Sequence, residues 1–265
     1  MNEIKTMSQF YRGRRKNNLF DPGSAAPYRL SRTRIELFLE CPRCFYLDRR
    51  LGVDRPPGFP FTLNSAVDLL LKKEFDAHRK KGEPHPLMRS QGIDAVPFQH
   101  EKINEWRDAL KGGVFHLDRL TDFLITGGID DLWINPAGEL HVVDYKATAK
   151  LAEVDLDQDW QAGYKRQAEV YQWLFRQNSF KVSKTAYFVY CNGDLKAEEL
   201  GGRLQFNLKI LPYEGNDSWI EEVLPKIQRC LTGSEIPAAG PDCDYCLYRR
   251  SISEVAKALK ISSQT

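Results

Sequence analysis

Asp130, Asp144 and Lys146 are residue types that together could hydrolyse a phosphodiester at a divalent metal ion. Two carboxylates placed side by side repel each other unless a cation lies between them. Carboxylate oxygens select Mg²⁺ or Mn²⁺, and a bound ion lowers the pKa of a water molecule that can then attack phosphorus. Lys146 could orient that water or offset charge in the transition state. The alternative is an ordinary surface ion pair between Asp144 and Lys146.

A hairpin would bring these side chains together. The segment Asn135-Pro136-Ala137-Gly138 fits a type I turn that is closed by a glycine in the left-handed conformation. A three-residue loop of this kind sets Asp130 across from Asp144, and Gly128 across from Lys146, on one face of the ribbon. The glycines at positions 127 and 128 are expected to leave room for a substrate backbone.

Hydrophobic periodicity along the rest of the chain predicts the elements that position this hairpin. Helices are expected over 31–41, 63–80, 99–110, 160–177 and 217–231, with a polar helix near the C-terminus and a proline-rich loop over 52–62. Strands are expected over 122–125, 128–134, 139–147, 185–191 and 203–210. This order predicts an α/β fold in which a mixed central sheet is flanked by helices.

Four of the six cysteines form two pairs with metal-ligand spacing, Cys41-x2-Cys44 and Cys243-x2-Cys246. Two residues between cysteines allow both thiolates to reach one centre, so the two pairs predict one four-cysteine site. A metal there would join the N-terminal and C-terminal segments and contribute folding energy. Thiolate spacing alone fits zinc and an iron–sulfur cluster equally, and reduced free cysteines remain a third possibility.

The order of several short motifs resembles the RecB-like branch of the PD-(D/E)XK nuclease superfamily. These motifs are Gly127, Ile129 and Asp130; then Asp144-Tyr145-Lys146; then Gln167 and Tyr171 on a helix; and, upstream, a Ser31-initiated helix that runs into Cys41-Pro42-Arg43-Cys44-Phe45. Together they cover about residues 30 to 250. The resemblance implies a restriction-endonuclease-like core and a metal-dependent DNA nuclease, an exonuclease in particular.

Roles for individual residues follow from the resemblance. It implies that Asp130 and Asp144 bind Mg²⁺ or Mn²⁺ with the backbone carbonyl of Tyr145, and that Lys146 is catalytic. Gln167 and Tyr171, four residues apart on one helical face, would contact DNA or support the site. Many relatives have a histidine ligand on the upstream helix, where this chain has Asp68. Asp68 could be a further metal ligand, be a solvated surface residue, or mark weakened catalysis.

The resemblance also bears on the cysteines. The chain is similar to the iron–sulfur members of the family, including the CRISPR-associated RecB-like exonucleases and the AddB-type nucleases, which place one cysteine before the core and three after it. This chain divides them two and two, with Cys230 as a possible substitute ligand. The family resemblance alone favours a four-iron, four-sulfur cluster over zinc. Cys191, in an apolar strand, is expected to be a core residue.

The composition limits how the chain could bind a nucleic acid. The net charge of +2 arises from 38 basic and 36 acidic residues, so any nucleic-acid surface must be local. Candidate phosphate contacts are Arg32, Arg34, Arg43, Arg49, Arg50, Lys165, Arg166, Arg249 and Arg250. The expected substrate is DNA, as single strands or ends with little sequence preference, and CRISPR adaptation or recombination and repair proteins are candidate partners.

No apolar run is long enough to span a membrane, and no secretory signal is visible, so a cytoplasmic location is expected. The expected organisation is a basic arm over 1–27, a RecB-like nuclease domain over 28–250, and a C-terminal helix or tail over 251–265. Within the domain, 28–62 and 232–250 form the cysteine region. The alternatives are a catalytically weakened DNA-binding or scaffold protein of the same fold, and a zinc-stapled RNA-processing nuclease.

Overall fold

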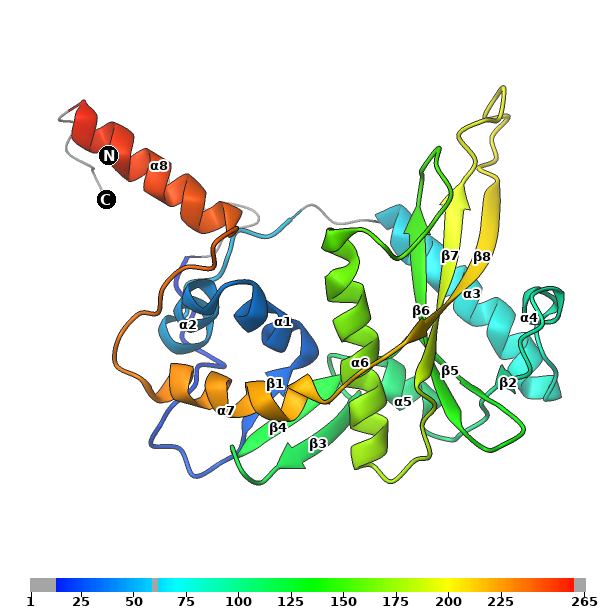
Figure 1. Ribbon diagram of the computed structural model, residues 1–265, viewed down its shortest axis with the longest axis horizontal. Helices are drawn as coiled ribbons and strands as arrows, with labels where there is room; N and C mark the ends of the chain where they lie inside the picture. The colour runs from blue at the N-terminus through cyan, green and yellow to red at the C-terminus, as the bar shows by residue number, and fades with distance from the viewer. Residues whose placement is uncertain (1–12, 59–61, 260–265) are drawn as a thin grey trace, which may run out of the picture. The chain divides into compact units, whose positions relative to one another are not determined.

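The computed structural model describes residues 13–58 and 62–259 (Figure 1). The chain forms two compact units. Among the described residues, one unit contains 13–58, 119–122 and 222–259, and the other contains 62–118 and 123–221. The fold is α/β, with a mixed sheet flanked by helices. Part of the expected basic arm, residues 1–12, lies outside the described residues, as do the last six residues of the expected tail.

The larger unit is built on a five-stranded sheet in the order β2-β5-β6-β7-β8. Its strands are β2 (Val96–Pro97), β5 (Asp131–Ile134), β6 (Leu140–Thr148), β7 (Thr185–Gly193) and β8 (Phe206–Glu214). The pair β6 and β7 is parallel, whereas the neighbouring pairs are antiparallel. Parallel strands need a crossover connection, which helix α6 (Ala162–Gln177) supplies.

The hairpin of β5 and β6 has the predicted register. Asp131 pairs with Val143 and Ile134 with Leu140, which is the register that the turn predicts. The ladder begins at Asp131, so the strand predicted over 128–134 was too long, and the predicted pairs of Asp130 with Asp144 and of Gly128 with Lys146 are not part of it. The turn matches the sequence prediction, because the Gly138 amide donates to the Asn135 carbonyl at 2.9 Å and Gly138 has φ of 75°. The side-chain oxygen of Asn135 also accepts a hydrogen bond of 2.9 Å from the backbone amide of Glu139.

Helices cover both faces of this sheet. Figure 1 shows α6 on one side of the strands and α3 (Thr62–Lys81) on the other. Val67, Leu71 and Phe75 of α3 pack in a buried core with Val143 and Tyr145 of β6. Cys191 belongs to the same core, as the sequence predicted. Because side chains alternate along a strand, Asp144 and Lys146 face the α6 side.

The remaining elements of the larger unit are shorter. They are α4 (Pro86–Ser90), α5 (Ile103–Arg107), the antiparallel pair β3 (Val114–Asp118) and β4 (Phe123–Gly127), and the 3-10 turn Asp159–Gln161. The helix predicted over 99–110 was wrong in extent. The carboxylate of Asp108 accepts from the amides of Leu110 and Lys111, both at 3.0 Å, and this turn ends the helix.

The smaller unit contains β1 (Tyr28–Ser31), α1 (Arg32–Glu40), α2 (Pro42–Leu51), α8 (Asp244–Ala258) and most of α7 (Trp219–Thr232). Asp48 of α2 is buried and forms ion pairs with Arg15 at 2.5 Å, Arg34 at 2.5 Å and Arg49 at 2.6 Å. This cluster anchors residue 15 of the expected arm on α2. Every helix within 13–58 and 62–259 is too short or too polar to cross a membrane.

Candidate active site and candidate metal centre

Asp68 and Asp130 share a cationic partner in the larger unit. The ammonium of Lys72 lies 2.9 Å from the carboxylate of Asp68, one helical turn before it on α3, and 3.1 Å from that of Asp130. The second oxygen of Asp130 accepts from the Tyr145 amide at 3.0 Å. Burial lowers the pKa of Lys72, but the negative charges of Asp130 and Asp68 outweigh burial and raise it. Lys72 was not singled out from the sequence.

Asp144 and Lys146 form an ion pair on the α6 side of β6. The Nζ atom of Lys146 lies 2.5 Å from the Asp144 carboxylate, whose side chain is only 1% exposed. The same ammonium donates to the Gln167 side chain at 3.3 Å and lies 4.1 Å from the ring centre of Tyr164. Gln167 in turn donates to the Tyr171 hydroxyl at 3.4 Å. Gln167 and Tyr171 therefore support Lys146 in this structure.

Asp68, Asp130 and Lys146 line one cavity of about 480 Å³, whereas Asp144, Gln167 and Tyr171 are not part of its lining. Its lining comes from α3, the hairpin and the start of α6, and comprises Asn64, Ser65, Val67, Asp68, Leu71, Asp130, Tyr145, Lys146, Ala147 and Tyr164. Oxygen donors of Asp68 and Asp130 suit Mg²⁺ or Mn²⁺. Among the described residues, only the four cysteines bring three or more ligand atoms within 4.8 Å of one another, so the three aspartates do not converge to that extent.

A buried ionic brace lies beside the hairpin and was not predicted. Asp131 is fully buried and forms ion pairs with Arg79 of α3 and with Arg107 of α5, the latter at 3.1 Å. The Tyr145 hydroxyl donates to the other Asp131 oxygen at 2.7 Å. Burial and the Asp131 charge raise the pKa of Tyr145 far above its usual value. The brace fixes α3, α5 and β6 around the cavity.

The paired glycines have a different role from the one predicted. A Cβ atom on Gly127 would lie 2.6 Å from the ring of Tyr171, and one on Gly128 would lie 2.6 Å from the Cβ of Ala109. The expectation that they leave room for substrate was therefore wrong. The glycines let α6 and the segment after α5 approach the backbone of the hairpin closely.

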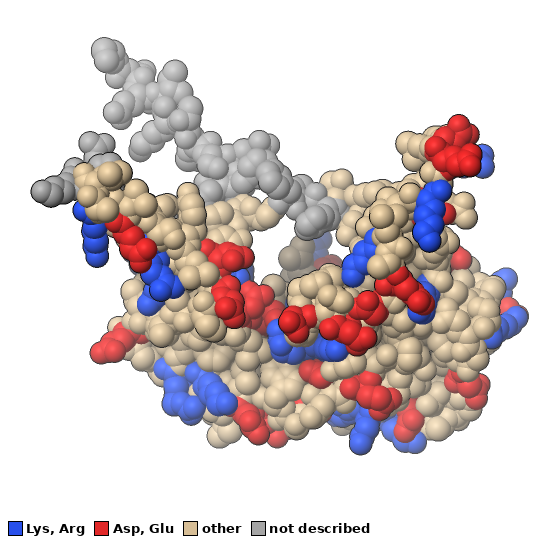
Figure 2. Space-filling model, turned by 45° about the horizontal axis from the view of Figure 1, so that its top comes forward, with Lys and Arg blue, Asp and Glu red and all other residues tan. Residues whose placement is uncertain are grey.

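Several of the predicted phosphate contacts are used inside the smaller unit. Arg34 and Arg49 are paired with Asp48, while Arg43 and Arg50 each donate at 3.0 Å to a backbone carbonyl, of Pro237 and Leu231 respectively. Figure 2 shows basic and acidic residues interspersed over the face that it draws. That face has no continuous basic stripe among the described residues.

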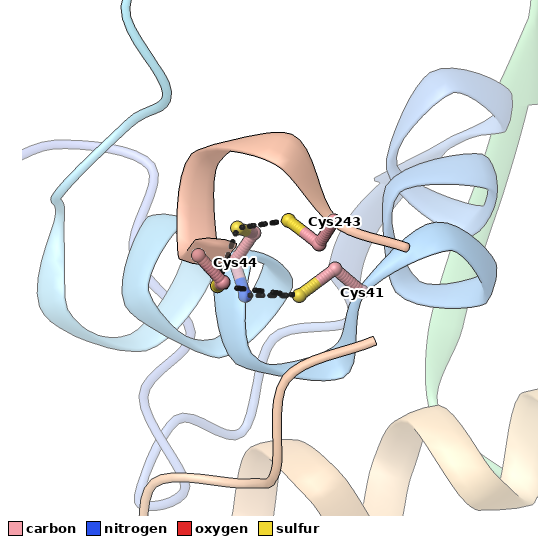
Figure 3. A group of neighbouring side chains, drawn as sticks. Cys41, Cys44 and Cys243 are labelled. Carbon is pink, nitrogen blue, oxygen red and sulfur yellow. Dashed lines mark hydrogen bonds between the residues drawn. The ribbon is translucent and has the colours of Figure 1, made fainter. Parts of the chain in front are cut away.

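The four cysteines converge in the smaller unit. The sulfur of Cys41 lies 3.8 Å from that of Cys246, and the sulfur of Cys44 lies 3.6 Å from that of Cys243 and 3.8 Å from that of Cys246. All four sulfur atoms lie within 4.8 Å of one another. Figure 3 shows the side chains of Cys41, Cys44 and Cys243 directed toward one another. Cys230 is not a member of this group.

Polar groups donate hydrogen bonds to two of the four cysteine sulfurs. The amides of Gly240 and Cys44 donate to the Cys41 sulfur at 3.2 and 3.4 Å, and the Arg55 guanidinium donates to the Cys243 sulfur at 3.5 Å. Burial raises the pKa of Cys41, but these amide donors and the neighbouring thiols outweigh burial and lower it to about 7. Burial instead raises the pKa of Cys44 and of Cys246. The suitability of the centre for a metal therefore rests on the convergence of the four sulfur atoms.

Comparison with known proteins identifies the family of this chain. The model of the PD-(D/E)XK nuclease superfamily matches residues 29–251. A solved structure described as "Crystal structure of SSO0001" is 16% identical, with 84% of each chain covered and a TM-score of 0.35. No curated protein matches the chain.

Proposed function

Since the chain belongs to the PD-(D/E)XK nuclease superfamily, we propose that it is a metal-dependent DNA nuclease whose active site contains Asp130, Asp144 and Lys146. Membership of this family indicates that the chain is a nuclease that acts on a nucleic acid. The observation that carries the proposal is the place of Lys146. It reaches the cavity that Asp68 and Asp130 line, and it is paired with the buried carboxylate of Asp144.

A buried ion pair is weak support for stability, because apolar residues of similar volume are often as stabilising. Asp144 and Lys146 are therefore better explained by function than by packing. The order of the family motifs along the hairpin and α6 supports the same residues.

Each residue has a proposed role. Asp130, Asp144 and the backbone carbonyl of Tyr145 would hold Mg²⁺ or Mn²⁺, with Asp68 as a further ligand from α3. The bound ion supplies Lewis acidity toward a phosphate oxygen and lowers the pKa of the attacking water. Lys146 offsets the negative charge that grows on the phosphate oxygens as the bond breaks.

Gln167 and Tyr171 act on Lys146 in this proposal. The hydrogen bond from Lys146 to Gln167 and the ring of Tyr164 fix the position of the ammonium. Recognition would involve the sugar-phosphate backbone, because no base-reading motif occurs in the sequence. A requirement for free DNA ends would make the enzyme an exonuclease.

The test is cleavage of end-labelled single-stranded and double-stranded DNA with Mg²⁺, Mn²⁺ or chelator. We expect metal-dependent products, which Asp144→Asn reduces by about 10³-fold or more, since the change removes charge needed at a catalytic metal. Asp157→Asn, at an exposed aspartate, is the matched control and should retain full activity. Closed circular DNA and RNA of the same sequence test the need for ends and the specificity for DNA.

A second candidate is a DNA-binding protein of the same fold with weakened catalysis. It is favoured by Asp68, which stands where relatives have histidine, and by Lys72, which neutralises two proposed ligands. Retained DNA binding without cleavage by wild-type protein in either metal would support this candidate and contradict the nuclease proposal.

A further inference from the structure

The spacing of the four cysteine sulfurs identifies the size of the centre that they can hold. In a tetrahedral zinc site each thiolate lies about 2.3 Å from the ion, which separates neighbouring sulfurs by about 3.8 Å. Three of the six sulfur separations here are 3.6, 3.8 and 3.8 Å, and the others are no longer than 4.8 Å. The arrangement of the cysteines therefore fits one ion at its centre.

A four-iron, four-sulfur cluster requires a wider arrangement. Each of its four cysteines binds a different iron, and the iron–sulfur bonds point outward from the corners of the cluster. The distance between two cysteine sulfurs then spans the separation of two irons and the two iron–sulfur bonds that diverge from them. It is much longer than the distance between two sulfurs bound to a single ion. All four sulfurs here lie within 4.8 Å of one another, so the cluster implied by the family resemblance does not fit.

Both cysteine pairs use the same local structure. Cys41 is the N-cap of α2 and Cys44 is the third residue of that helix, while Cys243 is the N-cap of α8 and Cys246 is the third residue of α8. An N-cap side chain and the third helical residue lie over the same first turn. Each pair is therefore arranged to chelate one ion at a helix N-terminus, where the helix dipole stabilises thiolates.

From this geometry we propose that Cys41, Cys44, Cys243 and Cys246 bind a single structural zinc ion instead of an iron–sulfur cluster. Tetrahedral coordination by four cysteines is one of the closed forms of structural zinc sites. Zinc also binds such ligands more tightly than ferrous iron does. Arg55, with its guanidinium 3.5 Å from the Cys243 sulfur, offsets part of the negative charge of four thiolates around a divalent ion.

The test is the metal and sulfide content of the full-length chain, purified without oxygen from cells supplied with both iron and zinc. We expect one zinc per chain, no acid-labile sulfide and no visible absorption. Replacement of zinc by Co²⁺ should give the intense ligand-field bands of a tetrahedral all-thiolate site. These readouts do not involve DNA, so they stand or fall separately from the nuclease proposal.

Cys246→Ser is expected to lose the zinc, and Cys230→Ser, outside the group, to retain it. Because Cys246→Ser could fail to fold, the wild-type metal content decides the matter. About four irons and four sulfides per chain would overturn the proposal. So would protein that folds fully with neither metal bound.

Discussion

Lys72 places a positive charge between two carboxylates that are proposed to hold a metal, at 2.9 Å from Asp68 and 3.1 Å from Asp130. A lysine and a divalent ion compete for the same oxygens, because each neutralises the same negative charge. When a metal binds, Lys72 must give up at least part of this contact.

Replacement of Lys72 by methionine should therefore strengthen metal binding. We expect the dissociation constant for Mn²⁺, measured by calorimetry, to fall by about tenfold or more, since one charge within a few ångströms of a divalent ion is worth several kcal/mol. The melting temperature without metal should fall, and the rise on adding Mn²⁺ should increase. Lys73→Met, on the exposed side of α3, is the control. Unchanged Mn²⁺ affinity would show that the metal does not use these two carboxylates.

For individual residues, the sequence predicts the structure correctly where neighbouring residues alone determine it. The Asn-Pro-Ala-Gly turn determines the hairpin register, which pairs Asp131 with Val143 as predicted. The ladder does not extend to Asp130, because the chain leaves the strand there. The sequence does not predict a role for Lys72, because a lysine four residues after an aspartate is an ordinary helical ion pair. Its second partner, Asp130, is distant in sequence. The two glycines were misinterpreted for the same reason, since their close neighbours come from other elements.

At the scale of elements, α6 approaches the end of β4 across Gly127. A Cβ there would lie 2.6 and 3.0 Å from two ring atoms of Tyr171, and 3.2 Å from Leu174. Tyr171 is 5% exposed, so its ring has little room to move. The glycine therefore sets how closely the helix that carries Gln167 can approach the sheet.

Gly127→Ala should destabilise the protein by about 1–3 kcal/mol, the usual range for overpacking a filled core. Urea unfolding measures the change, and Gly58→Ala, where a Cβ meets nothing within 4 Å, is the control. Truncation of the neighbour in Gly127→Ala/Tyr171→Leu should recover part of the loss. Purely additive losses in the double variant would contradict the proposed clash.

A second contact between elements joins α3 to α5 through Asp76. Its carboxylate is 3.0 Å from Arg79 and 2.9 Å from Arg107. Burial raises the pKa of Asp76, but the hydrogen bonds and charges of Arg107 and Arg79 outweigh burial, so its pKa lies below the ordinary 3.8. A carboxyl group whose pKa is lowered by folding stabilises the folded state at pH values above its unfolded pKa.

The stability difference between wild type and Asp76→Asn should accordingly depend on pH. It should be constant from neutral pH down to about the ordinary carboxyl pKa of 4, and should shrink as the pH falls through the lower pKa of the folded state. Urea unfolding at a series of pH values measures it, with Asp157→Asn as the exposed control. A difference that grows with acidity would show that Asp76 is not held ionised by the two arginines.

At the scale of the whole molecule, the fold class and the order of the elements followed from the sequence, because strand and helix periodicities differ strongly. The division into two compact units did not. The smaller unit is assembled from segments before residue 60 and after residue 221, together with residues 119–122. Only the cysteine pairs indicated that the distant segments meet. Weak local signals, such as the short strands β1 and β3, were missed.

This organisation predicts a local response to metal removal. Chelation should speed amide hydrogen exchange in α2 and the first turn of α8, which carry the four cysteines, because their folding is coupled to the metal. Exchange in β6 and α6 should change little. Mass spectrometry of peptides with and without chelator measures both. Equal acceleration in the sheet would mean that the two units unfold as one.

The sequence separation within the cysteine centre also has a consequence during synthesis. Cys44 and Cys246 are 202 residues apart. Since ribosomes add about 5–20 residues per second, the first cysteine pair waits roughly 10–40 s before its partner pair exists. Until then a nascent chain has only half of its ligands. The proposed zinc ion can therefore be bound by all four cysteines only after Cys243 and Cys246 have been synthesised. A truncated chain that lacks this second pair cannot be stabilised by the four-cysteine centre.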